Sequence, residues 1–172
     1  LDSNIVFQWM LADGAVGATA VDSAMLEAAE IFTRSLDFAR AHTREPNFVF
    51  IDLMEVHEHY QSEHKTLIRE EYQQRFSGTD SAYDNSIRQL SADLGAFITT
   101  LSHVPGWEDC VVVITSDHGE GLSDHPDTFD GAGHGRYLYN SQVAVPLILW
   151  NPKGMLGAGV TNRAVSLLDV AP

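Results

Sequence analysis

Apolar positions recur at helical spacing in two segments of the chain. Between residues 22 and 42 they lie three and four positions apart, which is the period of an amphipathic helix, and Asp22 or Ser23 supplies a capping side chain. The second segment, residues 80–101, repeats this spacing more regularly, and Pro105 follows its end. The pattern therefore predicts a helix over each segment.

Three short apolar runs predict strands: Phe48–Leu53, Val111–Thr115 and Val145–Trp150. The second run is β-branched throughout and has the length of a strand that is buried on both faces. Pro146 puts the third run at a sheet edge or marks the start of its strand. Helices and strands in this order predict one α/β layered domain over residues 1–172 with a largely parallel sheet.

The remaining segments give less definite patterns. Residues 1–21 are rich in Gly and Ala, and no structure is assigned to them. Residues 61–76 are strongly charged around a thin apolar line, which predicts a surface helix or an excursion over the strand ends. Ser166 is a residue type that caps helices, so a further helix is expected to begin there.

Charge and composition exclude several classes of partner. The formal net charge is −14, from 10 basic and 24 acidic residues, so most of the surface would repel nucleic acid. No window approaches the roughly 20 apolar residues of a membrane span.

The single cysteine, Cys110, excludes an intrachain disulfide. Leu1–Met10 lacks the pattern of a signal peptide, and we expect the chain to be a processed or trimmed piece.

Ionisable side chains stand where the predicted strand Val111–Thr115 ends. Asp117 and His118 follow it, and a turn at Gly119 lets neighbouring side chains converge on one point. Asp and His are metal-ligand types, and parallel sheets bind ligands at the carboxyl ends of their strands. His134, between two glycines, brings a second imidazole. The alternatives are an Asp that caps the turn, an exposed histidine beside it, and a flexible loop at His134.

A similar change from apolar to polar residues follows Phe48–Leu53. The next residues read MEVHEHY and contain His57, for which an ordinary surface histidine is the alternative. Arg136 lies two positions after His134 and offers a guanidinium that can pair with an anion, with a structural role as its alternative.

Five segments together resemble a known family. They read MEVHEHY from Met54, YDNSIRQLSADLGAFITTL from Tyr83, VVVITSDHGEGLSDH from Val111, GHGRYLYNSQVAVPLIL from Gly133 and VSLLDVAP from Val165. In order and spacing they are similar to the C-terminal part of the catalytic domain of the sulfatase family, within the alkaline-phosphatase-like superfamily. The resemblance implies an α/β/α layered sandwich, incomplete in this chain.

The resemblance also implies roles for single residues. Asp117 and His118 match the family segment whose acid and neighbour ligate the active-site metal. His134 matches a histidine that contacts the ester group or, in two-metal members, a second metal. His57 matches the histidine of an M-D-P-H segment that faces the sulfate or phosphate, although Glu55 replaces the usual Asp of that segment.

What the resemblance implies for the reaction is the metal-dependent hydrolysis of a small anionic ester, first of all a sulfate ester. A divalent ion is expected, with calcium first and manganese or zinc as alternatives. The alternative functions are phosphoryl transfer, as in a phosphodiesterase or phosphoethanolamine transferase, and non-catalytic binding of an anionic ligand. Family members are commonly exported or lysosomal, so an extracytoplasmic location is the default expectation.

The family's nucleophile segment has no counterpart in this sequence. Neither the C/S-x-P-x-R context nor the acidic pair of the first strand is present, and Cys110 lies before three valines instead. We therefore expect the chain to be part of a larger enzyme and to be inactive alone. Uncovered strand faces and a free sheet edge would favour self-association.

Overall fold

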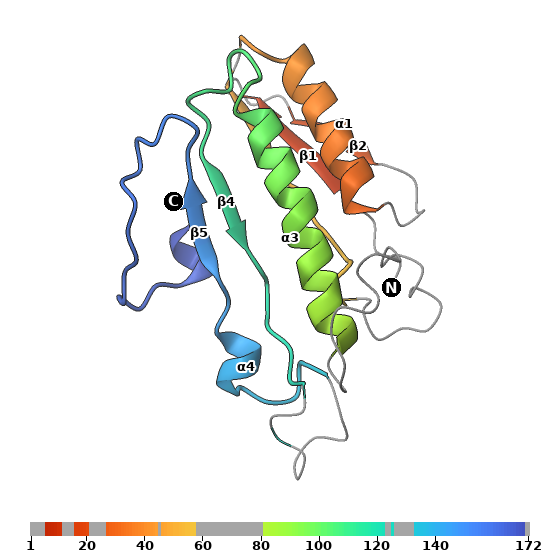
Figure 1. Cartoon of the computed structure of the whole chain (residues 1–172), viewed down its shortest axis with the longest axis vertical. Helices are drawn as coiled ribbons and strands as arrows, with labels where there is room; N and C mark the ends of the chain where they lie inside the picture. Colours follow the sequence, from red (N-terminus) through yellow and green to blue (C-terminus); the bar gives the residue numbers. More distant parts are fainter. Residues whose placement is uncertain are drawn as a thin grey trace. The chain divides into compact units, whose positions relative to one another are not determined.

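The computed structural model describes residues 6–11, 16–20, 27–44, 46–57, 81–122, 125 and 133–170. Contacts group the chain into two compact units, Leu1–Glu108 and Asp109–Pro172, and each is described by itself. Helices and strands both occur, as an α/β chain requires (Figure 1). That all residues form one domain stays a prediction, and residues 61–76 lie outside the described part.

A three-stranded antiparallel sheet opens the first unit. The strand β1 (Val6–Leu11) lies between β2 (Val16–Ala20) and β3 (Asn47–Val49). Trp9 pairs with Gly17 on one side and with Val49 on the other. The first two strands lie where the sequence assigned no structure. The strand β2 contains Gly and Ala, and β1 has Gln8 as its single polar residue, so neither shows the alternation of apolar and polar residues that marks a strand. The strand predicted over Phe48–Leu53 is real but shorter, since residues 50–54 have no regular structure.

The helices α1 (Ala28–Ala41) and α3 (Ser81–Leu101) lie against each other in the first unit (Figure 1). The helix α3 confirms the prediction for residues 80–101 over its described part. The helix α1 confirms the other prediction from Ala28 onward, but its N-cap is the extended Glu27, and the predicted caps Asp22 and Ser23 lie outside the described residues. The rings of Phe32 and Phe97 stack across the contact with centroids 4.7 Å apart, which adds to the stabilisation from burial. The apolar core is built around this pair and consists of Ala28, Ile31, Phe32, Leu36, Ala39, Phe97, Leu101 and Val104.

A carboxylate distant in sequence caps the N-terminus of α1. Glu55 accepts a hydrogen bond from the backbone N–H of Ala28, one of the groups that a helix start leaves without an intrahelical partner. The side chain is only 5% exposed, and burial raises its pKa, with further contributions from Asp93 and Glu27. The residue therefore joins the segment after β3 to the start of α1.

The turn after α3 depends on a glycine. Gly106 has φ +87, and a Cβ there would lie 2.2 Å from the carbonyl oxygen of Thr43. Trp107 donates its indole N–H to the carbonyl of His42 at 3.0 Å and fixes the turn beside the end of α1. A side chain at Gly106 would meet both backbone strain and a clash.

The second unit is built on two antiparallel strands, β4 (Val112–Thr115) and β5 (Leu147–Trp150). A short helix, α4 (Asn140–Val143), precedes β5, and a 3-10 turn, η3 (Leu167–Asp169), follows it. The prediction that Ser166 caps a helix is confirmed: its Oγ accepts from the N–H of Leu168, while its own N–H donates to Asp169.

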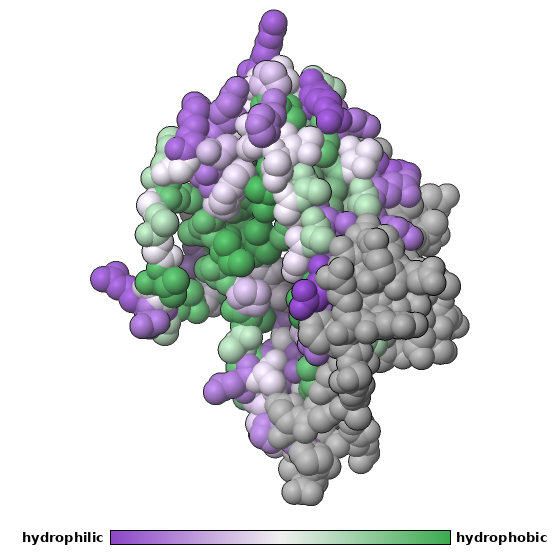
Figure 2. Space-filling model, in the orientation of Figure 1, coloured by the Kyte–Doolittle hydropathy of each residue, from purple (hydrophilic) through white to green (hydrophobic). Residues whose placement is uncertain are grey.

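The strand prediction for Val111–Thr115 is confirmed within one residue, but its expected surroundings are not. Every pairing between described strands is antiparallel, so the largely parallel sheet is not seen among them. Burial on both faces is wrong, since Val111 is 53% and Val113 is 41% exposed. Apolar surface gathers over β4 and β5 (Figure 2). A β-branched run predicts a strand, but it does not specify the strand's partner or what covers it.

The sequence predicts no membrane span in this chain. Among the described residues, no helix is both long enough and apolar enough to cross a bilayer.

Candidate metal and anion site

The candidate site begins where β4 ends. Thr115 donates its hydroxyl to the carbonyl of Pro146 at 2.8 Å and closes this end of the strand pair. The chain then turns: the hydroxyl of Ser116 donates to the carbonyl of His118 at 2.6 Å, and Asp117 Oδ1 accepts from the N–H of His118 at 2.9 Å. Asp117 and His118 thus lie at a strand end, as the sequence predicts.

Hydrogen bonding determines which nitrogen of His118 carries the proton. Its Nδ1 lies 2.8 Å from the carbonyl oxygen of Gly119, and a carbonyl can only accept. Nδ1 therefore carries the hydrogen, and in the neutral ring Nε2 holds the lone pair that a metal needs. Asp117 Oδ2 lies 3.7 Å from this Nε2.

Two close backbone approaches hold this turn in place. Gly119 donates its N–H to the carbonyl of Gln142 at 2.8 Å, and a Cβ on Gly119 would lie 2.1 Å from the carbonyl oxygen of Ser141. Gly121 and Gly133 exchange hydrogen bonds of 3.0 and 3.2 Å in an isolated antiparallel bridge. The bridge brings the segment that contains His134 back to the end of β4.

The two histidines of this unit meet face to face. The rings of His118 and His134 stack with centroids 3.9 Å apart and planes inclined by 29°. A ring nitrogen of each lies within 4.8 Å of one on the other. Two ligands of one tetrahedral zinc ion stand roughly 3–3.5 Å apart, by the usual bond lengths. The 3.7 Å between His118 Nε2 and Asp117 Oδ2 comes near this range, and His134 has a nitrogen within 4.8 Å of His118, so a modest shift of the ring would let it join the same ion.

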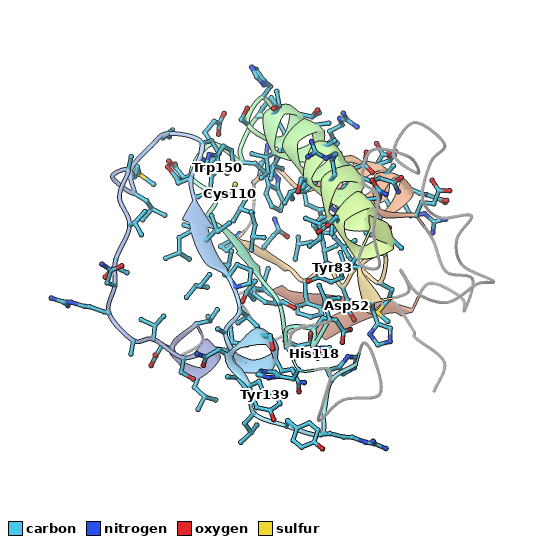
Figure 3. All side chains as sticks on the ribbon, turned by 60° about the horizontal axis from the view of Figure 1, so that its bottom comes forward. Asp52, Tyr83, Cys110, His118, Tyr139 and Trp150 are labelled. Atoms are coloured by element: carbon cyan, nitrogen blue, oxygen red, sulfur yellow. The ribbon has the colours of Figure 1, made fainter. Side chains whose placement is uncertain are left out.

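The candidate ligands are accessible to different degrees. The side chain of Asp117 is 86% exposed, that of His118 37% and that of His134 24%. Arg136 is exposed as well. Figure 3 shows His118 at the same end of the unit as Tyr139, the residue before α4. Solvent therefore reaches the site at the carboxylate of Asp117, whereas the ring of His134 is mostly covered by the protein.

His57 lies in the first unit and is partly buried in the turn after Glu55. Its role towards an anion stays a prediction, and so does that of Arg136.

The sequence reasoning assigned no role to three further residues at this end of the second unit: Glu120, Tyr137 and Tyr139. Glu120 contacts His134, with Oε2 3.2 Å from Nδ1. His125 stacks on Tyr139 at 3.7 Å, and Tyr137 stacks on the same ring at 5.4 Å. The position of Glu120 directly after Asp117-His118-Gly119 was the available signal. The aromatic stack had none, since the contact of His125 with Tyr139 depends on the fold and no local pattern encodes it.

Cys110 lies at the other end of the strand pair, beside Trp150 (Figure 3). Its carbonyl accepts from the side chain of Asn151 at 2.7 Å. Burial and the neighbouring Asp109 raise the pKa of the thiol. The thiolate is therefore disfavoured, which agrees with the expectation that Cys110 is a structural residue and not the nucleophile.

Comparison with known proteins gave one family. The model of the family described as sulfatase matches residues 12–172. No curated protein and no solved structure matched the chain.

Proposed function

Because the chain belongs to the sulfatase family, we propose that it forms part of a metal-dependent hydrolase of sulfate esters. Family membership indicates hydrolase chemistry on an ester. One observation supports the finer proposal. The rings of His118 and His134 stack with their centroids 3.9 Å apart, next to the exposed carboxylate of Asp117. Imidazoles and a carboxylate gathered at a strand end are suited to bind a cation and, through it, an anion.

In this proposal Asp117 and His118 hold the ion. Asp117 brings negative charge and a hard oxygen, and His118 brings the lone pair on Nε2 that its bond to Gly119 leaves there. A divalent metal would supply Lewis-acid stabilisation of charge on the ester oxygens. Calcium prefers six to eight oxygen ligands, so a donor set with imidazole nitrogen favours zinc or manganese over the calcium that the sequence placed first.

The remaining candidates face the anion. His134 either contacts the ester group or adds a third ligand, and its stacking on His118 supports both roles. His57 and the guanidinium of Arg136 are proposed to hold non-bridging oxygens of a small anionic substrate. The sequence contains neither the C/S-x-P-x-R context nor another residue assigned as nucleophile. We therefore infer that this chain by itself hydrolyses no ester.

The family also implies an alkaline-phosphatase-like fold, and we propose that β4 belongs to a larger, mostly parallel sheet of that kind. The antiparallel strand β5 would then be an edge strand, a common feature of mixed α/β sheets.

Metal titration tests the site directly. Calorimetry with Zn²⁺ and Mn²⁺ should show binding that Asp117→Ala abolishes. Asp109→Asn is the matched control, because it removes a carboxylate from the same unit that pairs with Lys153 instead. Equal affinity of the Asp117→Ala protein would put the metal elsewhere.

Substrate competition separates the alternatives. A sulfate-ester enzyme should bind an aryl sulfate in the metal-loaded state, whereas a phosphoryl-transfer relative should prefer an aryl phosphate. Binding of either anion without turnover, even when a nucleophile-bearing segment of the family is supplied, would favour a non-catalytic function. Measurable hydrolysis by this chain alone would contradict the inference that the nucleophile lies outside it.

A further inference from the structure

A buried carboxylate lies behind His134 in the second unit. The side chain of Glu120 is 7% exposed, and its Oε2 lies 3.2 Å from His134 Nδ1. Its Oε1 is buried without a hydrogen-bond partner among the described residues. Burying a carboxylate is unfavourable unless a donor compensates it. The contact with His134 is the compensation that the described structure provides.

The backbone places these two residues opposite each other. Gly121 and Gly133 exchange both of their hydrogen bonds in an antiparallel bridge, so they form a hydrogen-bonded pair. In the same register the preceding Glu120 faces the following His134. This is the position of a non-hydrogen-bonded pair, in which side chains stand closest and point to the same face.

Close packing around Gly121 makes this register specific. A Cβ on Gly121 would lie 2.8 Å from Nε2 of Gln142 and 2.9 Å from the carbonyl oxygen of Gly133. Gln142 is itself 4% exposed, so there is little room for its amide to move. The side chain of Glu120 is therefore held against His134 by the bridge and its surroundings, and not only by its own contact.

We propose that Glu120 is the positioning residue of His134. A carboxylate accepts and does not donate when ionised, so Nδ1 of His134 carries the hydrogen and Nε2 carries the lone pair. His118 has the same tautomer, because its Nδ1–H donates to the carbonyl of Gly119. Two stacked rings thus hold their lone pairs on the same kind of nitrogen, Nε2, as binding of a metal ion there requires.

A carboxylate behind a histidine is a general means of orienting the ring and raising its basicity as a ligand. The tautomer assignment is independent of any metal. Its consequence for metal binding rests on the proposed function, because it needs His134 to be a ligand. The two parts therefore call for two measurements on the same variants.

The first measurement is the imidazole ¹⁵N spectrum of the metal-free chain. The wild-type protein should show His134 with hydrogen on Nδ1, and Glu120→Ala should convert it to a mixture with the Nε2–H tautomer. His118 is an internal control, because its partner is a backbone carbonyl that the substitution leaves in place. Glu120→Gln should largely rescue the wild-type tautomer, since its amide oxygen can still accept from Nδ1–H.

The second measurement is Zn²⁺ affinity by calorimetry. Loss of an outer carboxylate typically lowers metal affinity about 10- to 100-fold, and Glu120→Ala should do so while Asp109→Asn does not. Glu120→Gln should lose less than Glu120→Ala.

The outcomes separate the two claims. A folded Glu120→Ala protein with an unchanged His134 tautomer would overturn the positioning role, whatever the metal does. If that variant does not fold, a wild-type His134 with hydrogen on Nε2 would overturn it equally. A changed tautomer with unchanged Zn²⁺ affinity would leave the positioning role intact and remove His134 from the metal site.

Discussion

His118 and His134 stack with their ring centroids 3.9 Å apart, although they come from separate segments that the Gly121–Gly133 bridge joins. If both rings serve one cation, either substitution by Ala should lower Zn²⁺ affinity by about 10-fold or more, which corresponds to about 1.4 kcal/mol. The double variant should lose less Zn²⁺ binding free energy than the sum of the two single losses, because both histidines bind the same ion. His103→Ala, an exposed histidine of the first unit, is the control. Additive losses in the calorimetry would show that the histidines act at separate sites.

The sequence predicted which ionisable residues stand at this strand end better than it predicted the architecture around them. Asp117 and His118 are adjacent in sequence and lie at a strand end, so local pattern was enough to place them. The contact of Glu120 with His134 depends on the register of an isolated bridge, which no local periodicity encodes. The antiparallel partner of β4 was likewise unpredictable, because strand composition does not distinguish the two directions of pairing.

The two long helices were the most predictable part of the fold, because their apolar residues repeat at helical spacing over many turns. The spacing of apolar residues does not predict the polar contact at the start of α1. Glu55 lies 27 positions after Ala28, and only the fold brings its carboxylate to that helix end.

The stacked pair of Phe32 and Phe97 gives a prediction about stability. Phe97 is 8% exposed, and its replacement by Ala removes both buried area and the ring contact. We expect Phe97→Ala to lower the free energy of unfolding by about 3–5 kcal/mol. Phe48→Ala is the matched control, because Phe48 is 54% exposed and should lose far less. Urea denaturation measures both. Similar losses in the two variants would mean that Phe97 is not part of the core.

Glu55 gives a prediction about pH. Burial raises its pKa above the usual 4.5, with Asp93 and Glu27 adding repulsion, so the folded chain holds this proton at pH values where the unfolded chain has lost it. Its contribution to stability is therefore complete below pH 4.5 and is lost as pH rises through the folded pKa. Glu55→Gln cannot titrate and can still accept from Ala28 N–H. Relative to this variant, the wild-type protein should lose stability as pH rises.

Urea denaturation of both proteins from about pH 4 to about pH 8 measures this difference. The exposed Asp52 supplies the control, since Asp52→Asn should follow the wild-type pH dependence. A difference between wild type and Glu55→Gln that stays constant over the range, or that runs in the opposite direction, would contradict the assignment.

Self-association of the chain should depend on the two strands of the second unit. Val113 and Leu149 are direct partners in the ladder and are 41% and 55% exposed. Paired apolar side chains on an accessible strand surface favour association with another chain. A charge there should oppose it, so Leu149→Lys should shift sedimentation velocity profiles towards the monomer. Val160→Lys, at a 97% exposed position outside the strands, should not. A wild-type protein that is monomeric at the same concentrations would refute the prediction.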